Sequence, residues 1–112
     1  MREEFSRAAL LLGEEALQTL GKSHVAVFGV GGVGSFCCEA LARAGIGSLS
    51  LFDSDTVARS NINRQIIALQ STVGRLKTAV MAERISDINP AAAVVSHPVF
   101  YTAENAEDFP LE

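Results

Sequence analysis

The sequence predicts an α/β protein with a Rossmann-like, doubly wound parallel sheet, and three observations support this prediction. Residues 24–29 form a short uncharged run rich in β-branched residues, typical of a strand that is buried on both faces of a parallel sheet. The run leads into the glycine sequence FGVGGVG, which commonly joins such a strand to a helix. Helix-like and strand-like segments then alternate as β-α-β-α-β-α, after a helical lead-in.

The lead-in is predicted to contain one or two short amphipathic helices over residues 3–20, broken at Gly13. We therefore divide the chain into a helical N-terminal segment, residues 1–22, and the N-terminal half of a nucleotide-binding domain, residues 23–112. Six apolar side chains are available for the buried face of the lead-in: Leu10, Leu11, Leu12, Ala16, Leu17 and Leu20.

Glycines define the first βαβ unit. A helix is expected over residues 32–44, because Gly45 and Gly47 are stop signals. The sequence SLSLF then forms a second strand that finishes at Asp53, and the polar residues 54–65 predict a loop or a short irregular helix.

The last third of the chain predicts three further elements. A helix is expected over residues 72–88, stopped by Pro90, and a third strand over residues 93–100. Thr102 is a plausible N-cap for a last short helix that begins at Ala103.

Three strands account for half of a complete doubly wound sheet, which has about six. We therefore expect the chain to be part of a larger domain, in which the strand at residues 24–29 is central. In the chain alone this strand lies at an edge, and an exposed apolar edge invites association. The isolated chain is accordingly expected to be unstable or to associate through this strand.

Composition and charge exclude several classes of protein. The 112 residues are 48% hydrophobic and 20% charged, which predicts a globular rather than a disordered chain. A net charge of −4 argues against a nucleic-acid footprint spread over the chain, so any RNA contact must be local. No apolar run approaches the roughly 20 residues of a membrane span. The acidic N-terminus is unlike a signal peptide, so we expect a cytoplasmic protein without membrane contact.

Cysteine and histidine carry little functional signal. Cys37 and Cys38 are adjacent and form no CxxC pair, so neither a disulfide nor a zinc site is indicated, and we expect both to pack in the interior. His24 and His97 lie at strand ends and are expected to be structural.

The glycine loop fits the pattern GxGxxG through Gly29, Gly31 and Gly34, directly after a strand and at the start of a helix. The first glycine permits a tight turn, the second lets the backbone approach a phosphate, and the third allows close helix packing. Gly32 adds another amide without a Cβ. The alternative is a strand-to-helix turn that binds nothing.

Two acids follow the second strand. Asp53 follows the glycine loop at nearly the spacing, ~20 residues, that is expected for an acid that hydrogen-bonds ribose hydroxyls. Asp55 either faces the nucleotide or metal, or merely starts a turn. Up to this point an NAD enzyme fits equally well.

The residues after these acids favour a triphosphate, which carries more charge than a pyrophosphate and therefore needs fixed cations. Arg64 can fork onto two phosphate oxygens, and Lys77 can act as a point charge near the reacting phosphorus. Asn61 and Gln65 add uncharged hydrogen-bonding groups. The stretch from the glycine loop to Lys77 therefore predicts an ATP-using enzyme.

In combination, GxGGxG, the strand-end DxD, SNxxRQ and the following lysine resemble the adenylating enzymes of the ThiF, MoeB and HesA group, relatives of the ubiquitin-activating enzymes. The resemblance covers nearly the whole chain. Within the group, RAALLLGEEAL, EALARAGIG and STVGRLKTAVMAERISDINP look most like the tRNA threonylcarbamoyladenosine dehydratases. This implies that ATP adenylylates the carboxylate of the modified adenosine, which then cyclises with loss of AMP.

The resemblance also implies roles for individual residues. The glycines cradle phosphate, Asp53 holds the ribose, and Arg64, Lys77 and their polar neighbours surround the phosphates. Arg7 matches an arginine that reaches into the site of a neighbouring subunit, which implies a homodimer.

The chain departs from the family pattern in two respects. Leu76 stands where the family usually has a proline, which bears on the pose of Lys77. The aspartate that binds Mg²⁺ in the family is expected beyond Glu112, as are any zinc-binding cysteines and the regions that contact tRNA. The chain alone is therefore expected to be inactive.

Three alternatives to the dehydratase stay open at this point. One is an adenylyltransferase for a sulfur-carrier or ubiquitin-like protein, which uses the same chemistry on a protein carboxyl terminus. The second is half of an NAD-dependent oxidoreductase. The third is a nucleotide-sensing or scaffold module without chemistry.

Overall fold

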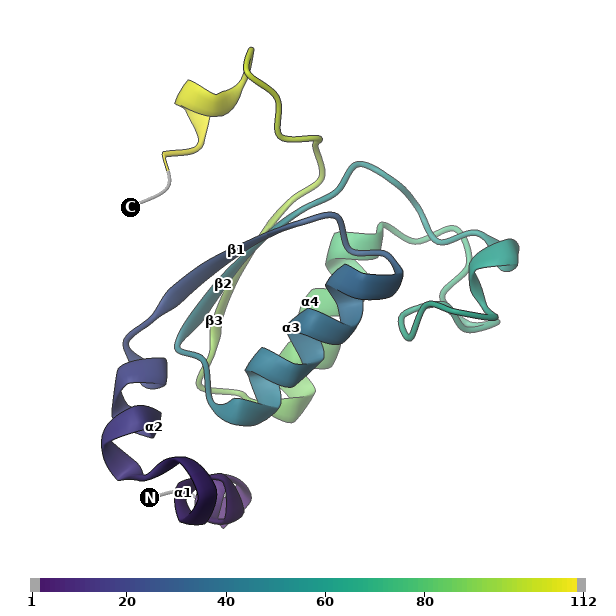
Figure 1. Ribbon diagram of the computed structural model, residues 1–112. Helices are drawn as coiled ribbons and strands as arrows, with labels where there is room; N and C mark the ends of the chain where they lie inside the picture. Colours follow the sequence, from purple (N-terminus) through teal and green to yellow (C-terminus); the bar gives the residue numbers. More distant parts are fainter. Residues whose placement is uncertain (1–2, 111–112) are drawn as a thin grey trace.

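A computed structural model describes residues 3–110 and shows an α/β chain built on a three-stranded parallel sheet (Figure 1). The strands are β1 (His24–Phe28), β2 (Ser48–Phe52) and β3 (Ala93–His97), side by side in the order β1-β2-β3. Their register brings the carboxyl ends of all three strands to the same edge of the sheet. The predicted fold class and the edge position of β1 are confirmed.

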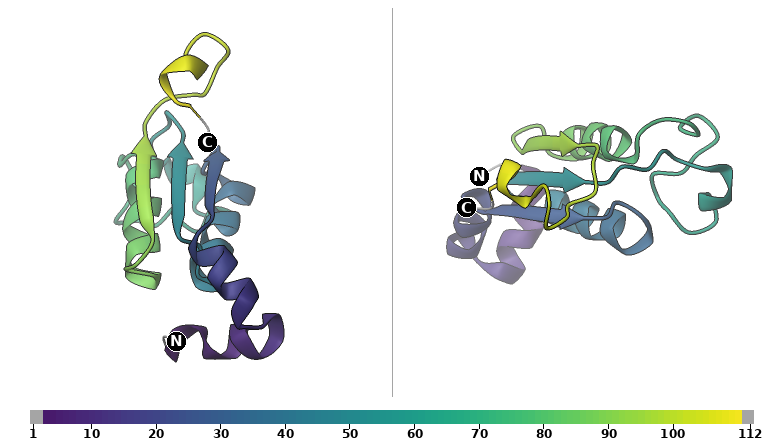
Figure 2. Two further views of the ribbon diagram at one scale, coloured as in Figure 1. Left: turned by 90° about the vertical axis from the view of Figure 1, so that its left-hand side faces the viewer. Right: turned by 90° about the horizontal axis from the view of Figure 1, so that it is seen from above.

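Two helices, α3 (Gly32–Ala44) and α4 (Lys77–Ile88), cover one face of this sheet (Figure 2). Consecutive right-handed crossovers in one direction place both helices on the same side. The layer between helices and sheet holds apolar side chains that are at most 2% exposed: Cys38, Ala42, Ile46, Leu49, Leu51, Met81 and Ile85.

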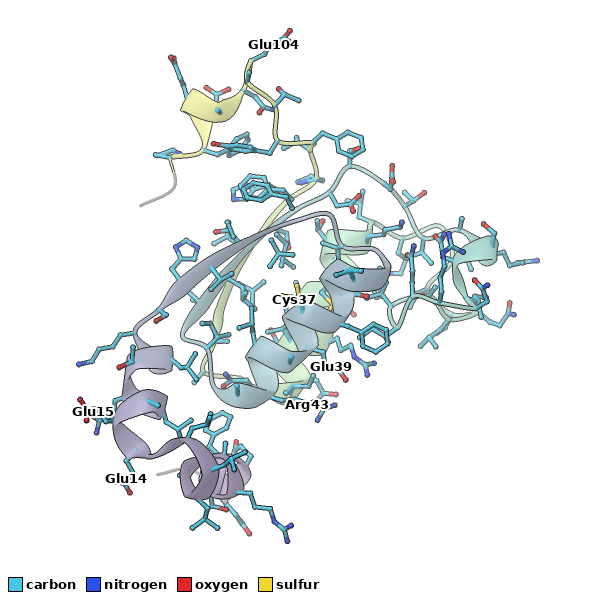
Figure 3. All side chains as sticks on the ribbon, viewed as in Figure 1. Glu14, Glu15, Cys37, Glu39, Arg43 and Glu104 are labelled. Carbon is cyan, nitrogen blue, oxygen red and sulfur yellow. The ribbon has the colours of Figure 1, made fainter. Side chains whose placement is uncertain are left out.

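An ion-pair network joins the two helices on their outer side, where Figure 3 shows Glu39 and Arg43 on α3. Glu39 accepts a hydrogen bond from Nε of Arg84 on α4, and its other oxygen lies 3.3 Å from Nε of Arg43. The hydrogen bond from Arg84 lowers the pKa of the Glu39 carboxyl, because it stabilises the charged form.

Among residues 3–110, no α-helix covers the opposite face of the sheet (Figure 2). Phe28 and Val95 are consequently half exposed, at 50% and 51%. The prediction that β1 is buried on both faces is therefore wrong: only Val27 of that strand is buried, because β1 is an edge strand under a single helical layer. At the carboxyl end of this face, Tyr101 packs on Phe28 with ring centroids 4.8 Å apart.

The N-terminal segment forms η1 (Glu3–Phe5), α1 (Ser6–Leu12) and α2 (Glu14–Gly21), and the predicted break falls at Gly13, whose φ is +90°. The predicted buried face is partly wrong. Leu10 and Leu11 are 89% and 87% exposed, because α1 lies beyond the amino ends of the strands, where no layer of this chain covers it (Figure 1). Leu20 of α2 packs against the core.

The start of α4, the end of β3 and the segment after Thr102 differ from the prediction. α4 begins at Lys77 rather than residue 72, because Gly74 has a φ of +90° and Leu76 is extended. β3 ends at His97, since Pro98 cannot donate to the strand ladder. The hydroxyl of Thr102 accepts a hydrogen bond from an amide three residues on, as a cap does, but closes only a turn.

The predicted C-terminal helix is replaced by this turn and by the short 3-10 helix η3 (Ala106–Asp108), and η2 (Arg59–Asn61) is a second such helix in the loop after β2. Cys38 is buried as predicted, whereas Cys37 is exposed on α3 (Figure 3). Within residues 3–110, no helix has the length and apolar character needed to cross a membrane.

Candidate functional site

The glycine loop leads from the carboxyl end of β1 into α3. Gly29 has a φ of +92°, which side chains other than glycine rarely adopt. At Gly34 a Cβ would lie 1.8 Å from the carbonyl oxygen of Gly29, so the first turn of α3 packs directly on the loop. The predicted roles of Gly29 in the turn and Gly34 in close packing are confirmed.

The first turn of α3 presents amides to the loop. Its N-cap is Gly31, which offers no side chain to accept hydrogen bonds from them. The Ser35 hydroxyl donates back to the Gly31 carbonyl, so it does not cap the amides either. A helix end in this state attracts anions through free N–H groups and the helix dipole.

Asp53 ties the glycine loop to the end of β2. It is 5% exposed, and its Oδ2 accepts a hydrogen bond of 2.8 Å from the amide of Val30 in the loop. Its Oδ1 accepts one of the same length from the amide of Asp55. Each oxygen keeps a second lone pair, so the carboxylate can hold the loop and still accept from another donor.

Asp55 continues this connection through its backbone. Its carbonyl accepts a hydrogen bond of 3.0 Å from the amide of Lys77, the first residue of α4, while its side chain is exposed. A chain of three hydrogen bonds thus runs from Val30 through Asp53 and Asp55 to Lys77. We call it the Asp53 connection. Its three donors are backbone amides, and Asp53 is the only residue that takes part through its side chain.

Lys77 is only 7% exposed. Within the described part of the chain its ammonium group has no hydrogen bond or ion pair, although buried lysines are normally paired. The preceding Leu76 has φ −61° and ψ 132°, the conformation that proline favours. The departure from the family pattern at Leu76 therefore leaves the backbone before Lys77 in the geometry of a proline.

Asn61 shapes the turn after η2. It is 8% exposed, its Oδ1 accepts from the amide of Ala58 at 2.8 Å, and its carbonyl accepts from the amides of Arg64 and Gln65 at 3.1 and 2.9 Å. Its side-chain oxygen therefore has a structural partner, and its amide nitrogen keeps its donors.

Gln65 lies against the glycine loop. Its Nε2 is 3.4 Å from the point where a Cβ on Gly31 would stand, and the side chain is 8% exposed. Its Oε1 is buried without a hydrogen-bond partner, an arrangement that costs about 1–3 kcal/mol in a folded protein. The structure thus brings Gln65 and the loop together, as the sequence predicts.

Arg64 is close to the loop through its backbone only. Its carbonyl oxygen is 3.8 Å from the position of a Cβ on Gly32, whereas its guanidinium is exposed and donates to the Ser60 carbonyl and to Oδ1 of Asn63, both at 3.0 Å. Arg7 lies on α1, at the amino end of the sheet and away from the loop (Figure 1). Its side chain cannot reach the site of its own chain.

Other concave surfaces and acidic groups do not coincide with this site. A cavity of about 460 Å³ lies at the amino ends of the strands, between α2 and residues 44–47. Among residues 3–110, no three His, Cys, Asp or Glu side chains are placed to hold a metal ion.

A parallel sheet whose glycine loop is fixed to a strand-end aspartate defines a Rossmann-type nucleotide-binding protein. The pattern that defines the ThiF family matches residues 5–111, and the chain belongs to that family.

Relatives within the family are close. The chain is 53% identical over 109 residues to the tRNA threonylcarbamoyladenosine dehydratase of Bacillus subtilis, covering 97% of this chain and 43% of that one. A crystal structure of the Escherichia coli tRNA N6-threonylcarbamoyladenosine dehydratase, in complex with ATP, is 48% identical with a TM-score of 0.94 over 96% of this chain and 44% of that one. The sulfur carrier protein adenylyltransferase of Thermus thermophilus is 35% identical, over 85% and 35% of the two chains. The chain spans less than half the length of these relatives.

Proposed function

We propose that the chain carries the ATP-binding part of an enzyme that activates a carboxylate by adenylylation, and that this carboxylate belongs to threonylcarbamoyladenosine in tRNA. The observation that carries the proposal is the Asp53 connection, which joins the glycine loop to the backbone of Lys77, a largely buried lysine whose ammonium has no partner within residues 3–110. The sequence identity to tRNA threonylcarbamoyladenosine dehydratases supports this choice of carboxylate.

The residues present fit a nucleoside triphosphate. Within residues 3–110, the uncapped first turn of α3 and the ammonium of Lys77 offer donors without partners, and triphosphate oxygens are acceptors. The E. coli relative binds ATP in its crystal structure. The residues that would hold the nucleotide are Gly29, Gly31, Gly32, Gly34, Asp53, Asp55, Asn61, Arg64, Gln65 and Lys77. Mg²⁺ as a partner of ATP is part of the proposal and rests on the family resemblance.

The chemistry that these residues support is charge stabilisation. Attack of a carboxylate on a phosphorus builds negative charge on the phosphoryl oxygens, and fixed cations and amides lower the barrier without a protein nucleophile. Within residues 3–110, the Lys77 ammonium has no internal partner to release. Arg64 would have to release the Ser60 carbonyl and Asn63 before it could contribute.

Arg7 is proposed to act in trans, in a homodimer. Its exposed place on α1, at the far end of the sheet from the glycine loop, supports this. An arginine in this position can complete a site only in a second subunit.

The test uses the complete protein that contains this chain. Lys77→Ala should lower ATP–pyrophosphate exchange by about 10²–10³-fold, the usual effect of losing one preorganised charge-stabilising group. Lys22→Ala removes an exposed lysine at the amino end of the sheet and should leave exchange unchanged. Mass analysis of tRNA nucleosides should show loss of one water with the unmodified enzyme.

Two results would contradict this proposal. Tighter equilibrium binding of NADH than of ATP with magnesium would favour the oxidoreductase alternative. Intact exchange with a sulfur-carrier protein, together with unchanged tRNA nucleosides, would show that the carboxylate belongs to a protein.

A further inference from the structure

Building on the proposed function, we propose that an exposed surface on η2 and the following turn contacts the sugar–phosphate backbone of the RNA substrate, with Arg59 as its main phosphate contact. We call this surface the η2 tip and define it by Arg59, Ser60 and Asn63, all of which are exposed.

Charge is distributed unevenly along the chain. The net charge is −4, yet residues 56–82 contain four cations and no acid: Arg59, Arg64, Arg75 and Lys77. The labelled acids Glu14, Glu15 and Glu104 lie on the lead-in and the C-terminal segment, away from η2 (Figure 3). A local positive surface is the kind of RNA contact that a chain of negative net charge can make.

Arg59 differs from the arginines of the helical layer. Arg43 and Arg84 pair with Glu39, and Arg75 forms a bidentate pair with Glu83. Within residues 3–110, the guanidinium of Arg59 has neither a hydrogen bond nor an ion pair. It is therefore free to bind an external anion without giving up an internal partner.

The η2 tip has a defined position beside the nucleotide site. Figure 1 shows η2 on the loop between β2 and α4, projecting from the sheet on the side of the glycine loop. The loop is anchored by Val57 and Ile67, which are 2% and 1% exposed, and by a bridge between Thr56 and Leu76. Because Asn61 holds the turn, the tip is presented by an ordered backbone rather than by a free loop.

The chemistry of the tip matches a nucleic-acid backbone. Guanidinium, hydroxyl and amide groups are the side chains that most often contact phosphate and sugar oxygens, and such contacts orient a substrate without reading its sequence. Arg64 and the nucleotide site bind phosphates of ATP in the proposed function, whereas Arg59 lies further along the projecting loop. An RNA strand entering the site would cross this tip on its way to the glycine loop.

The test measures binding of substrate tRNA to the complete protein by fluorescence anisotropy at several salt concentrations. Arg59→Ala should weaken binding roughly five- to tenfold at low salt and lower the slope of log K against log salt by about 0.7–0.9, the value for one phosphate contact. Arg59→Lys keeps the charge and should retain the slope. Lys22→Ala, an equal charge change at the other end of the sheet, should leave both quantities unchanged.

Binding of ATP with magnesium is measured in parallel and separates this inference from the proposed function. Unchanged ATP affinity in Arg59→Ala, with KM for tRNA raised and kcat kept, is the expected result. An unchanged salt slope in Arg59→Ala would overturn the role of the tip while leaving the proposed function intact. Lower affinity for ATP would assign Arg59 to the nucleotide instead, and would also overturn it. An unmodified enzyme that fails to dehydrate tRNA would reject the proposed function itself.

Discussion

The two ends of the sheet differ in what holds their residues in place. At the carboxyl end, polar groups are positioned by hydrogen bonds within the chain, from Val30 through Asp53 to the amide of Lys77. At the amino end, α1 turns apolar side chains such as Leu10 outward, and nothing in the described part of the chain covers them. The candidate site is thus specified by the chain itself, whereas the surroundings of α1 are not.

The largest expected effect comes from adding a Cβ to the glycine that has the tightest backbone contact at each end of the sheet. Gly34→Ala places a Cβ 1.8 Å from the Gly29 carbonyl, and Gly47→Ala places one 2.0 Å from the Gly21 carbonyl. Each should lower the free energy of unfolding by about 3 kcal/mol or more, measured by urea denaturation. Only Gly34→Ala should also impair ATP binding in variants that still fold. Equal ATP affinity in both would break the distinction between the two ends.

Asp53→Asn tests the hydrogen bonds of the carboxyl end. An amide has one acceptor oxygen, so its NH₂ group must face one of the two amides that the carboxylate now accepts from. We expect the free energy of unfolding to fall by about 2 kcal/mol, as for a buried unsatisfied group. Exposed Asp55→Asn is the matched control and should change stability little. Similar losses of unfolding free energy in both variants would show that Asp53 contributes no more to stability than Asp55.

Glu39→Gln tests the helical layer between the two ends. The hydrogen bond from Arg84 lowers the pKa of Glu39, so its stabilising contribution is present above the unfolded-state pKa and is lost as pH falls through the folded-state value. The variant should lose about 0.5–1 kcal/mol at neutral pH and less in acid. Denaturation at pH 7 and pH 3 checks this; a difference that grows toward low pH would contradict the assignment.

Leu76→Pro should leave the chain as stable as before or stabilise it by about 0.4–1 kcal/mol, because Leu76 already has the φ of proline. Its amide is not used in the bridge to Thr56, which is formed by the neighbouring amides. Leu69→Pro is the control, since the Leu69 amide donates to the Thr72 hydroxyl. Thermal melting should separate the two variants in opposite directions.

The smallest effect is expected on α1. Leu10→Ser and Leu11→Ser remove side chains that are 89% and 87% exposed, so each should change the stability of the monomeric chain by less than about 0.5 kcal/mol. Melting curves at two protein concentrations check this. A larger loss in a monomer would mean that α1 packs within the chain, contrary to the comparison of the two ends.

Local sequence signals correctly predicted the helix at Gly32–Ala44, the strand at Ser48–Phe52 and the break at Gly13. Glycines and short uncharged runs determine the backbone conformation within a few residues, so these elements do not depend on distant contacts. The start of α4 was predicted too early, at residue 72 rather than Lys77, because the helical spacing that predicts this helix lies after residue 79 and does not fix where it begins. The positive φ of Gly74 is not visible in that spacing. The short helix predicted near Thr102 has the right cap but too few contacts to propagate.

The sequence by itself determined the order of elements, the glycine loop and the identity of the polar residues near it, because these depend on residue types at short spacings. Only the tertiary structure decided which of those residues are used and which are free: Asp53 holds the loop, Arg64 hydrogen-bonds within its own turn, and the ammonium of the largely buried Lys77 has no partner within residues 3–110. Every residue except proline has a backbone amide, so residue types do not reveal which amides donate these hydrogen bonds. They become visible only when strand ends distant in sequence meet at one edge of the sheet.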